Sequence, residues 1–326
     1  MSSLVKMHTP VLLITFNRPK HTRKVLDAIL AAKPKDLYVF QDGPRANSAT
    51  DGNKCSEVRD LVDEMIDGTQ IRLHKLYSDK NLGCGPGPMT ALNWFFSEIE
   101  YGIILEDDAV PHPDFFPFCE ELLLKYKDDV DIRAIGSMHL DTMTYGDGSY
   151  YFSMMNRTFC AWATWARAWK DFDLYHRNVT RRQFSQCLKD YGCGLRMREY
   201  WCERLAEVQK DAYHNSSWDQ QFWMSIWLHH GKGIMPNVNL SSNIGFGAEA
   251  THTFSSKSVG SNRKTGSIMP LKHPSSSRIQ KKADKRFQAI YFDPGQYGWK
   301  GWKSLPFRLN KRVKRLVGHE GPWFGK

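Results

Sequence analysis

The strongest constraint on the fold is an alternation of short apolar runs with amphipathic segments along the first third of the chain. Apolar runs occupy residues 11–16, 37–40 and 103–105, and residues 71–77 alternate apolar and polar side chains. Between these runs, apolar residues recur at helical spacing after Pro19, over residues 57–66 and over residues 89–99. An alternation of strands and helices favours right-handed crossover connections between parallel strands. We therefore predict an α/β fold with a mostly parallel sheet flanked by helices.

Three consecutive carboxylates follow the apolar run at residues 103–105. They are Glu106, Asp107 and Asp108, and Pro111 then prevents the strand from continuing. Adjacent acids repel one another, and a cation would hold them together. Hard oxygen ligands at this density suit Mn²⁺ or Mg²⁺ better than zinc. Taken alone, the triplet also fits a solvated acidic turn.

Two further polar residues follow predicted strands. Arg18 comes after the first apolar run and Asp42 after the second. Ligands of parallel sheets bind at the carboxyl ends of the strands, so one cleft is expected to contain Arg18, Asp42 and the acidic triplet. The glycine-rich residues 81–87 match no phosphate-binding fingerprint, and we interpret them as a flexible loop near this cleft or as a simple turn.

The second half of the chain is rich in aromatic residues. Trp162 and Trp218 flank small or polar residues, and they are the best candidates for stacking on the ring of a sugar substrate, although tryptophan at helical spacing is more often core. Asp219 falls in the first turn of a predicted helix, where the helix dipole favours an ionised base, as it also favours a simple cap. His252 is a candidate phosphate donor or metal ligand, or an ordinary surface histidine.

Charge is unevenly distributed along the 326 residues. The net charge is +10, but residues 256–326 contain 17 Lys or Arg against 3 Asp or Glu, so the rest is slightly acidic. A basic tail behind an acidic body favours an anchoring element over a nucleic-acid-binding face. Residues 309–317 place apolar side chains on one helical face among basic ones, which predicts either a peripheral helix on an anionic membrane or a solvated helix.

Further features of the sequence limit the cellular location and the domain organisation of the protein. No apolar run approaches the ~20 residues that span a bilayer, the first residues do not resemble a signal peptide, and the seven cysteines form no Cys-x-x-Cys pair. A cytoplasmic protein is expected. We divide the chain into a first half (1–135), a second half (136–255) and the basic tail (256–326).

The ordered motifs resemble a known family. The segments are 14–18, 40–42, 103–108 with 113–116, 218–219, and 246–247 with His252. Together they are similar to the N-acetylglucosaminyltransferase I family and to bacterial nucleotide-diphospho-sugar transferases of the GT-A fold. The likeness covers roughly residues 8–255. Its most specific part is Glu-Asp-Asp followed by Asp-Phe-Phe.

The resemblance implies that residues 1–135 form a nucleotide-sugar-binding half and residues 136–255 an acceptor-binding and catalytic half. It also implies roles for individual residues. Arg18 and Asp42 would contact the nucleotide, Asp42 at the uracil, and Glu106 and Asp107 would contact the donor sugar and the ribose. Asp108 would be the direct protein ligand of Mn²⁺ on the diphosphate, and Asp219 would be the base. The chain lacks the family's donor-contacting histidine near residues 87–89.

The reaction expected from this resemblance is transfer of a sugar, such as N-acetylglucosamine or a related hexose, from a UDP-sugar to a hydroxyl of a glycan or lipid-linked glycan. Inversion with Asp219 as base is the preferred mechanism. A retaining transferase on the same fold is one alternative. A non-catalytic glycan- or nucleic-acid-binding protein is another, but it leaves the acidic triplet unexplained.

Overall fold

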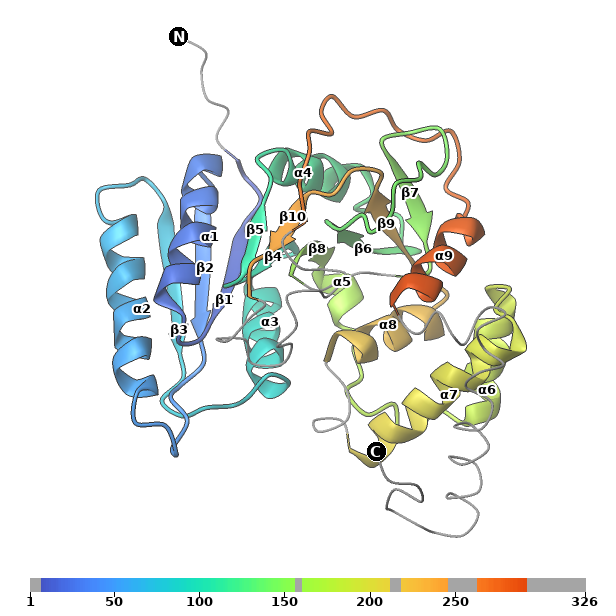
Figure 1. The fold of residues 1–326 in the computed structure, drawn as a ribbon, viewed down its shortest axis with the longest axis horizontal. Helices are drawn as coiled ribbons and strands as arrows, with labels where there is room; N and C mark the ends of the chain where they lie inside the picture. The colour runs from blue at the N-terminus through green and yellow to red at the C-terminus, as the bar shows by residue number, and fades with distance from the viewer. Residues whose placement is uncertain (1–6, 156–159, 212–217, 246–262, 292–326) are drawn as a thin grey trace, which may run out of the picture.

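A computed structural model describes residues 7–155, 160–211, 218–245 and 263–291 (Figure 1). Within these residues, eight strands form one mixed sheet in the order β3-β2-β1-β4-β8-β6-β9-β7. The strands are β1 (Val11–Thr15), β2 (Asp36–Gln41), β3 (Arg72–Tyr77), β4 (Tyr101–Glu106), β6 (Ile132–Gly136), β7 (Tyr150–Ser153), β8 (Ala161–Trp165) and β9 (Lys232–Pro236). A second, two-stranded sheet pairs β5 (Ala109–Pro111) with β10 (Ser241–Asn243) in antiparallel fashion.

Helices connect the strands and cover both faces of the sheet (Figure 1). They are α1 (Pro19–Ala32), α2 (Asp51–Ile66), α3 (Pro86–Glu98), α4 (Phe115–Lys125), α5 (Ala166–Trp169), α6 (Arg181–Asp190), α7 (Leu195–Lys210), α8 (Trp218–Leu228) and α9 (Lys281–Tyr291). Strands β1 to β4 are parallel, with α1, α2 and α3 between them. The predicted α/β architecture is therefore confirmed. Helix α2 begins six residues before the predicted start, because its first turns bury Asp51 and Cys55 although the segment has no apolar periodicity.

Two hydrophobic cores lie on opposite faces of the sheet. Alternate residues of β1 point to different cores, as the pleat of a strand requires: Val11 and Leu13 pack with α1 and α2, whereas Leu12 and Ile14 pack with α3 and α8. Because each face of β1 is covered, its sequence is apolar throughout and all five of its residues are buried.

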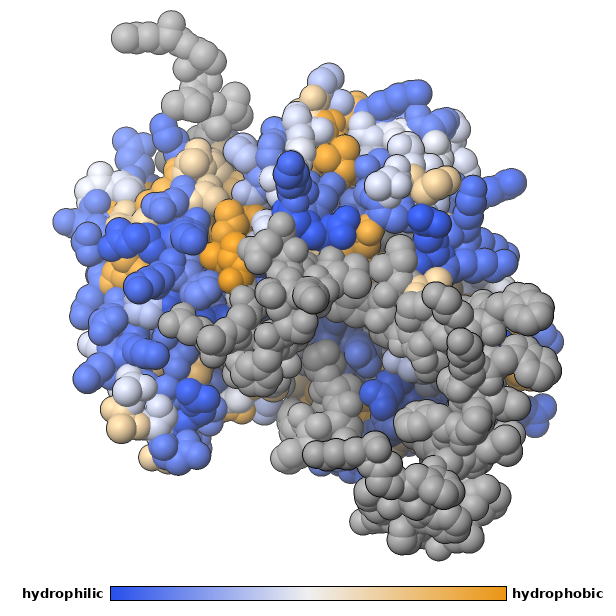
Figure 2. Space-filling model, in the orientation of Figure 1, coloured by the Kyte–Doolittle hydropathy of each residue, from blue (hydrophilic) through white to orange (hydrophobic). Residues whose placement is uncertain are grey.

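The sheet continues without interruption from the first half of the chain into the second. Strand β8 inserts antiparallel between β4 and β6, and the predicted boundary after residue 135 falls within β6. The two halves of the chain thus share one sheet, and their proposed division of labour stays a prediction. The described surface in the view of Figure 2 is mainly hydrophilic, with small apolar patches. Within the described part of the chain, no helix is both long and apolar enough to cross a bilayer.

Candidate active site

The strand order places a topological switch point between β1 and β4. The chain runs outward from β1 to β2 and β3 on one side, and β4 pairs with β1 on the other side. β1 and β4 are parallel, with Ile14 opposite Glu106 in the register. The residues that directly follow the two strands therefore lie side by side at the carboxyl edge. In open α/β sheets this crevice is the usual ligand-binding position.

Arg18 and the acidic triplet meet at this edge. The Arg18 guanidinium forms a two-pronged ion pair with Asp107, in which Nη2 bonds to Oδ1 and Nε donates to Oδ2 at 3.3 Å. Its Nη1 donates to Asp108 Oδ2 at 3.1 Å. Burial lowers the pKa of Arg18, but the charges of Asp107 and Asp108 outweigh this effect and raise it above the ordinary value. The convergence predicted for Arg18 and the triplet is thus observed.

Glu106 and Asp219 belong to the same electrostatic environment. Burial, together with the negative charges of Asp108, Asp219 and Asp107, raises the pKa of Glu106 to about 8. Asp219 lies in the first turn of α8, as predicted, and is partly buried. Burial also raises the pKa of Asp107, although Arg18 opposes this shift. Asp107 and Asp108 share the Arg18 guanidinium, and Glu106 and Asp219 add further negative charge to the same environment. This excess of negative charge favours a bound cation.

A short turn after β10 encloses Asp108 from the far side of the chain. Asn243 Nδ2 donates to Asp108 Oδ1 at 3.2 Å, and the Ile244 amide donates to the Asp108 carbonyl oxygen at 2.9 Å. A Cβ at Gly245 would lie 2.0 Å from Asp108 Oδ2, so any larger residue there would force the Asp108 side chain to shift. The sequence did not reveal this contact, since residues 108 and 243 are brought together only by the β5–β10 pairing.

Cys160 lies on the same side of the site, in contact with Glu106 and Asn243. Its carbonyl oxygen accepts the Glu106 amide at 2.9 Å, and its Sγ lies 3.1 Å from Asn243 Nδ2. The residue has a φ of 68°, in the left-handed region that non-glycine residues rarely adopt. Burial raises the pKa of the thiol well above its ordinary value. Nothing in the sequence around Cys160 signalled this position.

The residues at this edge fit a divalent cation held mainly through one protein carboxylate. Among the residues that the structure describes, no group of three or more His, Cys, Asp or Glu side chains forms a complete metal cage. Asp108 is 8% exposed and offers hard oxygen atoms beside a binding crevice. Mg²⁺ and similar ions are commonly held by one or two carboxylates together with substrate phosphates. Asp108 therefore presents oxygen atoms of the kind that Mn²⁺ or Mg²⁺ prefers, and its role as a metal ligand stays a prediction.

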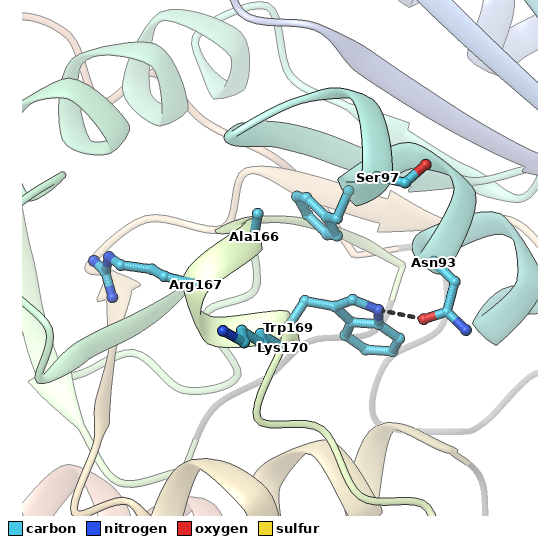
Figure 3. Close-up of a pocket in the computed structure, with 7 residues that line it drawn as sticks. Asn93, Ser97, Ala166, Arg167, Trp169 and Lys170 are labelled. Atoms are coloured by element: carbon cyan, nitrogen blue, oxygen red, sulfur yellow. Dashed lines mark hydrogen bonds between the residues drawn. The ribbon is translucent and has the colours of Figure 1, made fainter.

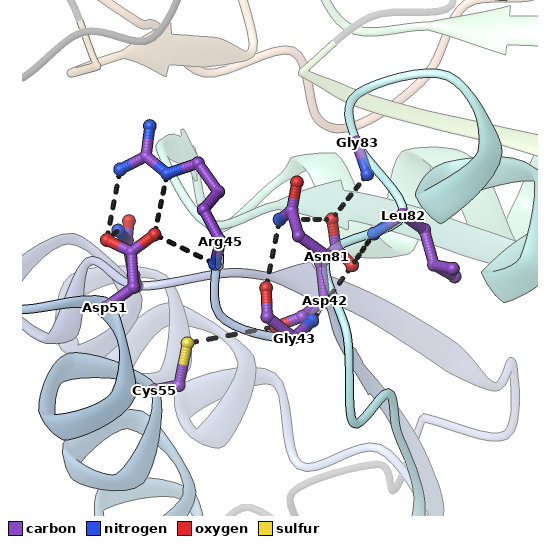
Figure 4. A network of polar contacts seen from close by, with 9 residues as sticks. Asp42, Gly43, Arg45, Asp51, Cys55, Asn81, Leu82 and Gly83 are labelled. Carbon is purple, nitrogen blue, oxygen red and sulfur yellow. Dashed lines mark hydrogen bonds and ion pairs between the residues drawn. The ribbon is translucent and has the colours of Figure 1, made fainter. Parts of the chain in front are cut away.

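Asp42 has a structural environment that the sequence did not suggest (Figure 4). Its carboxylate accepts the amides of Gly43, Leu82 and Gly83 at 2.7–2.9 Å and the Asn81 side-chain amide at 3.0 Å. Burial raises the pKa of Asp42 although these amides oppose the shift. Asp42 thus fixes the glycine-rich loop beside the start of α3, and its contact with a nucleobase stays a prediction.

A second polar network lies beside Asp42 (Figure 4). Asp51 accepts hydrogen bonds from Arg45 Nε at 2.6 Å, Arg45 Nη2 at 3.0 Å and Asn17 Nδ2 at 2.8 Å. The Arg45 guanidinium also lies 5.5 Å from the ring centroid of Phe16. These contacts join the residues after β1 to those after β2. Sequence reasoning missed the network, because none of its pairs is close in the chain at helical or strand spacing.

The predicted acceptor residues lie in the core on the α3 and α8 face. The Trp162 and Trp218 rings are 5.8 Å apart, and Trp162 is fully buried whereas Trp218 is 6% exposed. Trp218 directly precedes Asp219 in α8, and Trp162 packs with Trp218 in the same hydrophobic core. Acceptor contact stays a prediction for both residues. His252 lies outside the described residues.

A separate cavity of about 330 Å³ lies between α3 and α5 (Figure 3). Its walls are Asn93, Phe96, Ser97, Ala166, Arg167, Trp169 and Lys170. Helix α5 follows β8, which ends opposite Tyr101 at the start of β4. The cavity is therefore at the amino edge of the parallel strands, the opposite edge from the carboxylates.

Comparisons with known proteins give only distant structural similarity. No known protein family and no curated protein sequence matches the chain significantly. The apo structure of a UDP-glucose pyrophosphorylase aligns with a TM-score of 0.36 and 8% identity, over 71% of this chain and 90% of that one. A UDP-glucose pyrophosphorylase complexed with UDP-glucose gives 0.31 and 10%, over 51% and 79%. An inositol-1-phosphate CTP transferase from T. maritima gives 0.30 and 9%, over 50% and 73%. Such low TM-scores do not bear on activity.

Proposed function

We propose that this protein is a metal-dependent glycosyltransferase that moves a sugar from a UDP-sugar to a hydroxyl of a glycan or lipid-linked glycan, with inversion. The supporting observation is the arrangement of Arg18, Asp107 and Asp108 at the switch point between β1 and β4, with Glu106 and Asp219 in the same electrostatic environment. A solvated acidic turn would not bury Asp107 to 3% exposure and pair it with an arginine from another strand end.

Each residue has a chemical task in this proposal. Asp108 would hold Mn²⁺ or Mg²⁺, which neutralises charge on the departing diphosphate when it is bound. Arg18 is placed to donate hydrogen bonds to phosphate oxygens. Asp219, at the positive end of the α8 dipole, would accept the proton of the acceptor hydroxyl. Glu106 would contact the donor sugar beside Asp219.

The direct test is nucleotide binding measured by calorimetry. Wild-type protein is expected to bind UDP in the presence of Mn²⁺ and to hydrolyse or transfer from one member of a panel of UDP-, GDP- and dTDP-sugars. Asp108→Asn keeps the shape of the side chain but removes its charge, so it should lose metal-dependent binding. Absence of metal-dependent nucleotide binding in the wild type would refute the proposed function.

The base is tested with Asp219→Asn. This variant should bind UDP and Mn²⁺ normally but turn over at least ~100-fold more slowly, the usual scale for losing a general base. Asp190→Asn, at the exposed end of α6, is the matched control and should keep full activity. Normal turnover in the Asp219 variant would remove it from the mechanism. Product stereochemistry by NMR separates inversion from retention, since a retained anomeric configuration excludes this base.

A membrane-surface role for the basic tail is a second proposal. Most of residues 256–326 lies outside the described residues, but α9 is a described part of this tail and exposes Lys281, Lys282, Lys285 and Arg286. These positions are one turn apart in pairs and form one basic face. Such a face suits anionic lipid headgroups. Deletion of residues 300–326 should reduce sedimentation with anionic vesicles, and unchanged sedimentation would refute a role for the tail.

A further inference from the structure

The Arg18 guanidinium donates to Asp108, the same carboxylate that would bind the proposed metal. Its Nη1 donates to Asp108 Oδ2 at 3.1 Å, while Nε and Nη2 bond to the two oxygens of Asp107. The two acids are 3% and 8% exposed, so the guanidinium is their counter-ion in a nearly dry environment. Charges in such surroundings interact more strongly than in water.

Asp108 has little freedom to turn away from Arg18. Asn243 Nδ2 bonds to its other oxygen at 3.2 Å, and the Asn243 side-chain oxygen accepts the Gly245 amide at 2.8 Å. Gly245 itself leaves no room behind the carboxylate, since even a Cβ there would be 2.0 Å from Oδ2. Arg18 is equally restrained through its double contact with Asp107. A cation that binds Asp108 must therefore lie close to the guanidinium, and the two positive charges repel each other.

We infer that Arg18 couples metal binding to nucleotide binding. With no nucleotide present, the guanidinium neutralises Asp107 and Asp108 and keeps metal affinity low. A nucleotide diphosphate brings negative charge between the two cations, offers Arg18 new acceptors and removes the repulsion. Metal and nucleotide then bind together, and by linkage each raises the affinity of the other by the same factor. This inference rests on the proposed function and assigns to Arg18 the coupling between the two binding steps.

The test measures Mn²⁺ affinity by electron paramagnetic resonance of the free ion, with and without UDP. In the wild type, UDP should tighten Mn²⁺ binding at least about tenfold, within the usual range of coupling between two sites. Arg18→Gln removes the charge and leaves Asp107 and Asp108 in need of a cation. This variant should bind Mn²⁺ alone about tenfold more tightly than the wild type, and UDP should then tighten it less than about threefold.

Two further variants serve as controls. Arg23→Gln replaces an exposed arginine of α1, the helix that begins directly after Arg18; its Nη2 lies 3.7 Å from Glu64 Oε2, and the variant should behave like the wild type. Arg18→Lys keeps the charge, so it should keep low Mn²⁺ affinity without UDP and retain at least about fivefold coupling. Circular dichroism checks whether Arg18→Gln folds. If it does not fold, Arg18→Lys provides the test.

The outcomes are distinct. If the wild type shows coupling and Arg18→Gln shows the same coupling, or Arg18→Lys loses it, this inference is wrong and the proposed function stands. If the wild type binds no Mn²⁺ even with UDP, both are wrong. Tight Mn²⁺ binding by the wild type without UDP also overturns the inference.

Discussion

Replacing Gly245 with alanine tests the enclosure of Asp108 directly. The added Cβ would lie 2.0 Å from Asp108 Oδ2, 2.7 Å from its Cγ and 2.8 Å from its Cβ, whereas ordinary contact begins at 3.4 Å. Relief requires a movement of about 1.4 Å. Such a shift would break the hydrogen bonds of 3.1 Å and 3.2 Å that Asp108 accepts from Arg18 and Asn243.

The energetic consequence can be bounded from these contacts. Overpacking a filled site costs about 1–3 kcal/mol, and losing a hydrogen bond to a charged group costs about 1.5–3 kcal/mol. Because the displacement relieves part of the overpacking, we expect Gly245→Ala to lower the free energy of unfolding by about 2–4 kcal/mol. The variant should also weaken metal-dependent UDP binding, since the displaced carboxylate no longer faces the crevice.

The assay combines urea unfolding with calorimetry of UDP binding in the presence of Mn²⁺. Gly52→Ala is the matched control, since a Cβ at Gly52, in the first turn of α2, meets nothing within 4 Å. This control should keep wild-type binding and gain up to ~1 kcal/mol of stability from helix propensity. Wild-type stability and wild-type binding in Gly245→Ala would refute the close approach of the turn to Asp108.

Three other outcomes are expected. The Arg45 hydrogen bond holds the pKa of Asp51 well below its usual value, so the charged form stabilises the fold above the unfolded pKa of about 3.8. Asp51→Asn should lower the free energy of unfolding by about 1–3 kcal/mol at pH 7. In urea unfolding at a series of pH values, this loss of stability relative to the wild type should shrink as the pH falls below the unfolded pKa. A loss that does not depend on pH would contradict the charge argument. Asp42→Ala should release the loop at residues 82–83, with faster amide exchange there by hydrogen-exchange mass spectrometry; unchanged exchange would show that Asp42 does not hold the loop. Chelation with EDTA should abolish sugar transfer and added Mn²⁺ should restore it, whereas chelator-resistant transfer would exclude the metal.

Local sequence patterns were sufficient for β1 to β4 and for the helices between them, apart from the start of α2, and for the position of the acids along the chain. The apolar run of β1 indicated burial on both faces, and the acids after β4 followed from where the apolar residues end. The first-turn position of Asp219 followed from helical spacing alone. These features depend on neighbours within a few residues, and periodicity reports such neighbours well.

The partners of the site residues were decided by the tertiary structure. Asp42 bonds to a loop some forty residues away, and Asn243 reaches Asp108 from the second half of the chain. The antiparallel insertion of β8, which brings Cys160 to Glu106, has no signature in the sequence. Hydrogen bonds between distant segments depend on strand order and register, which local propensity does not encode. The sequence by itself determined which residues carry charge at the strand ends, and only the packed sheet decided which charges meet.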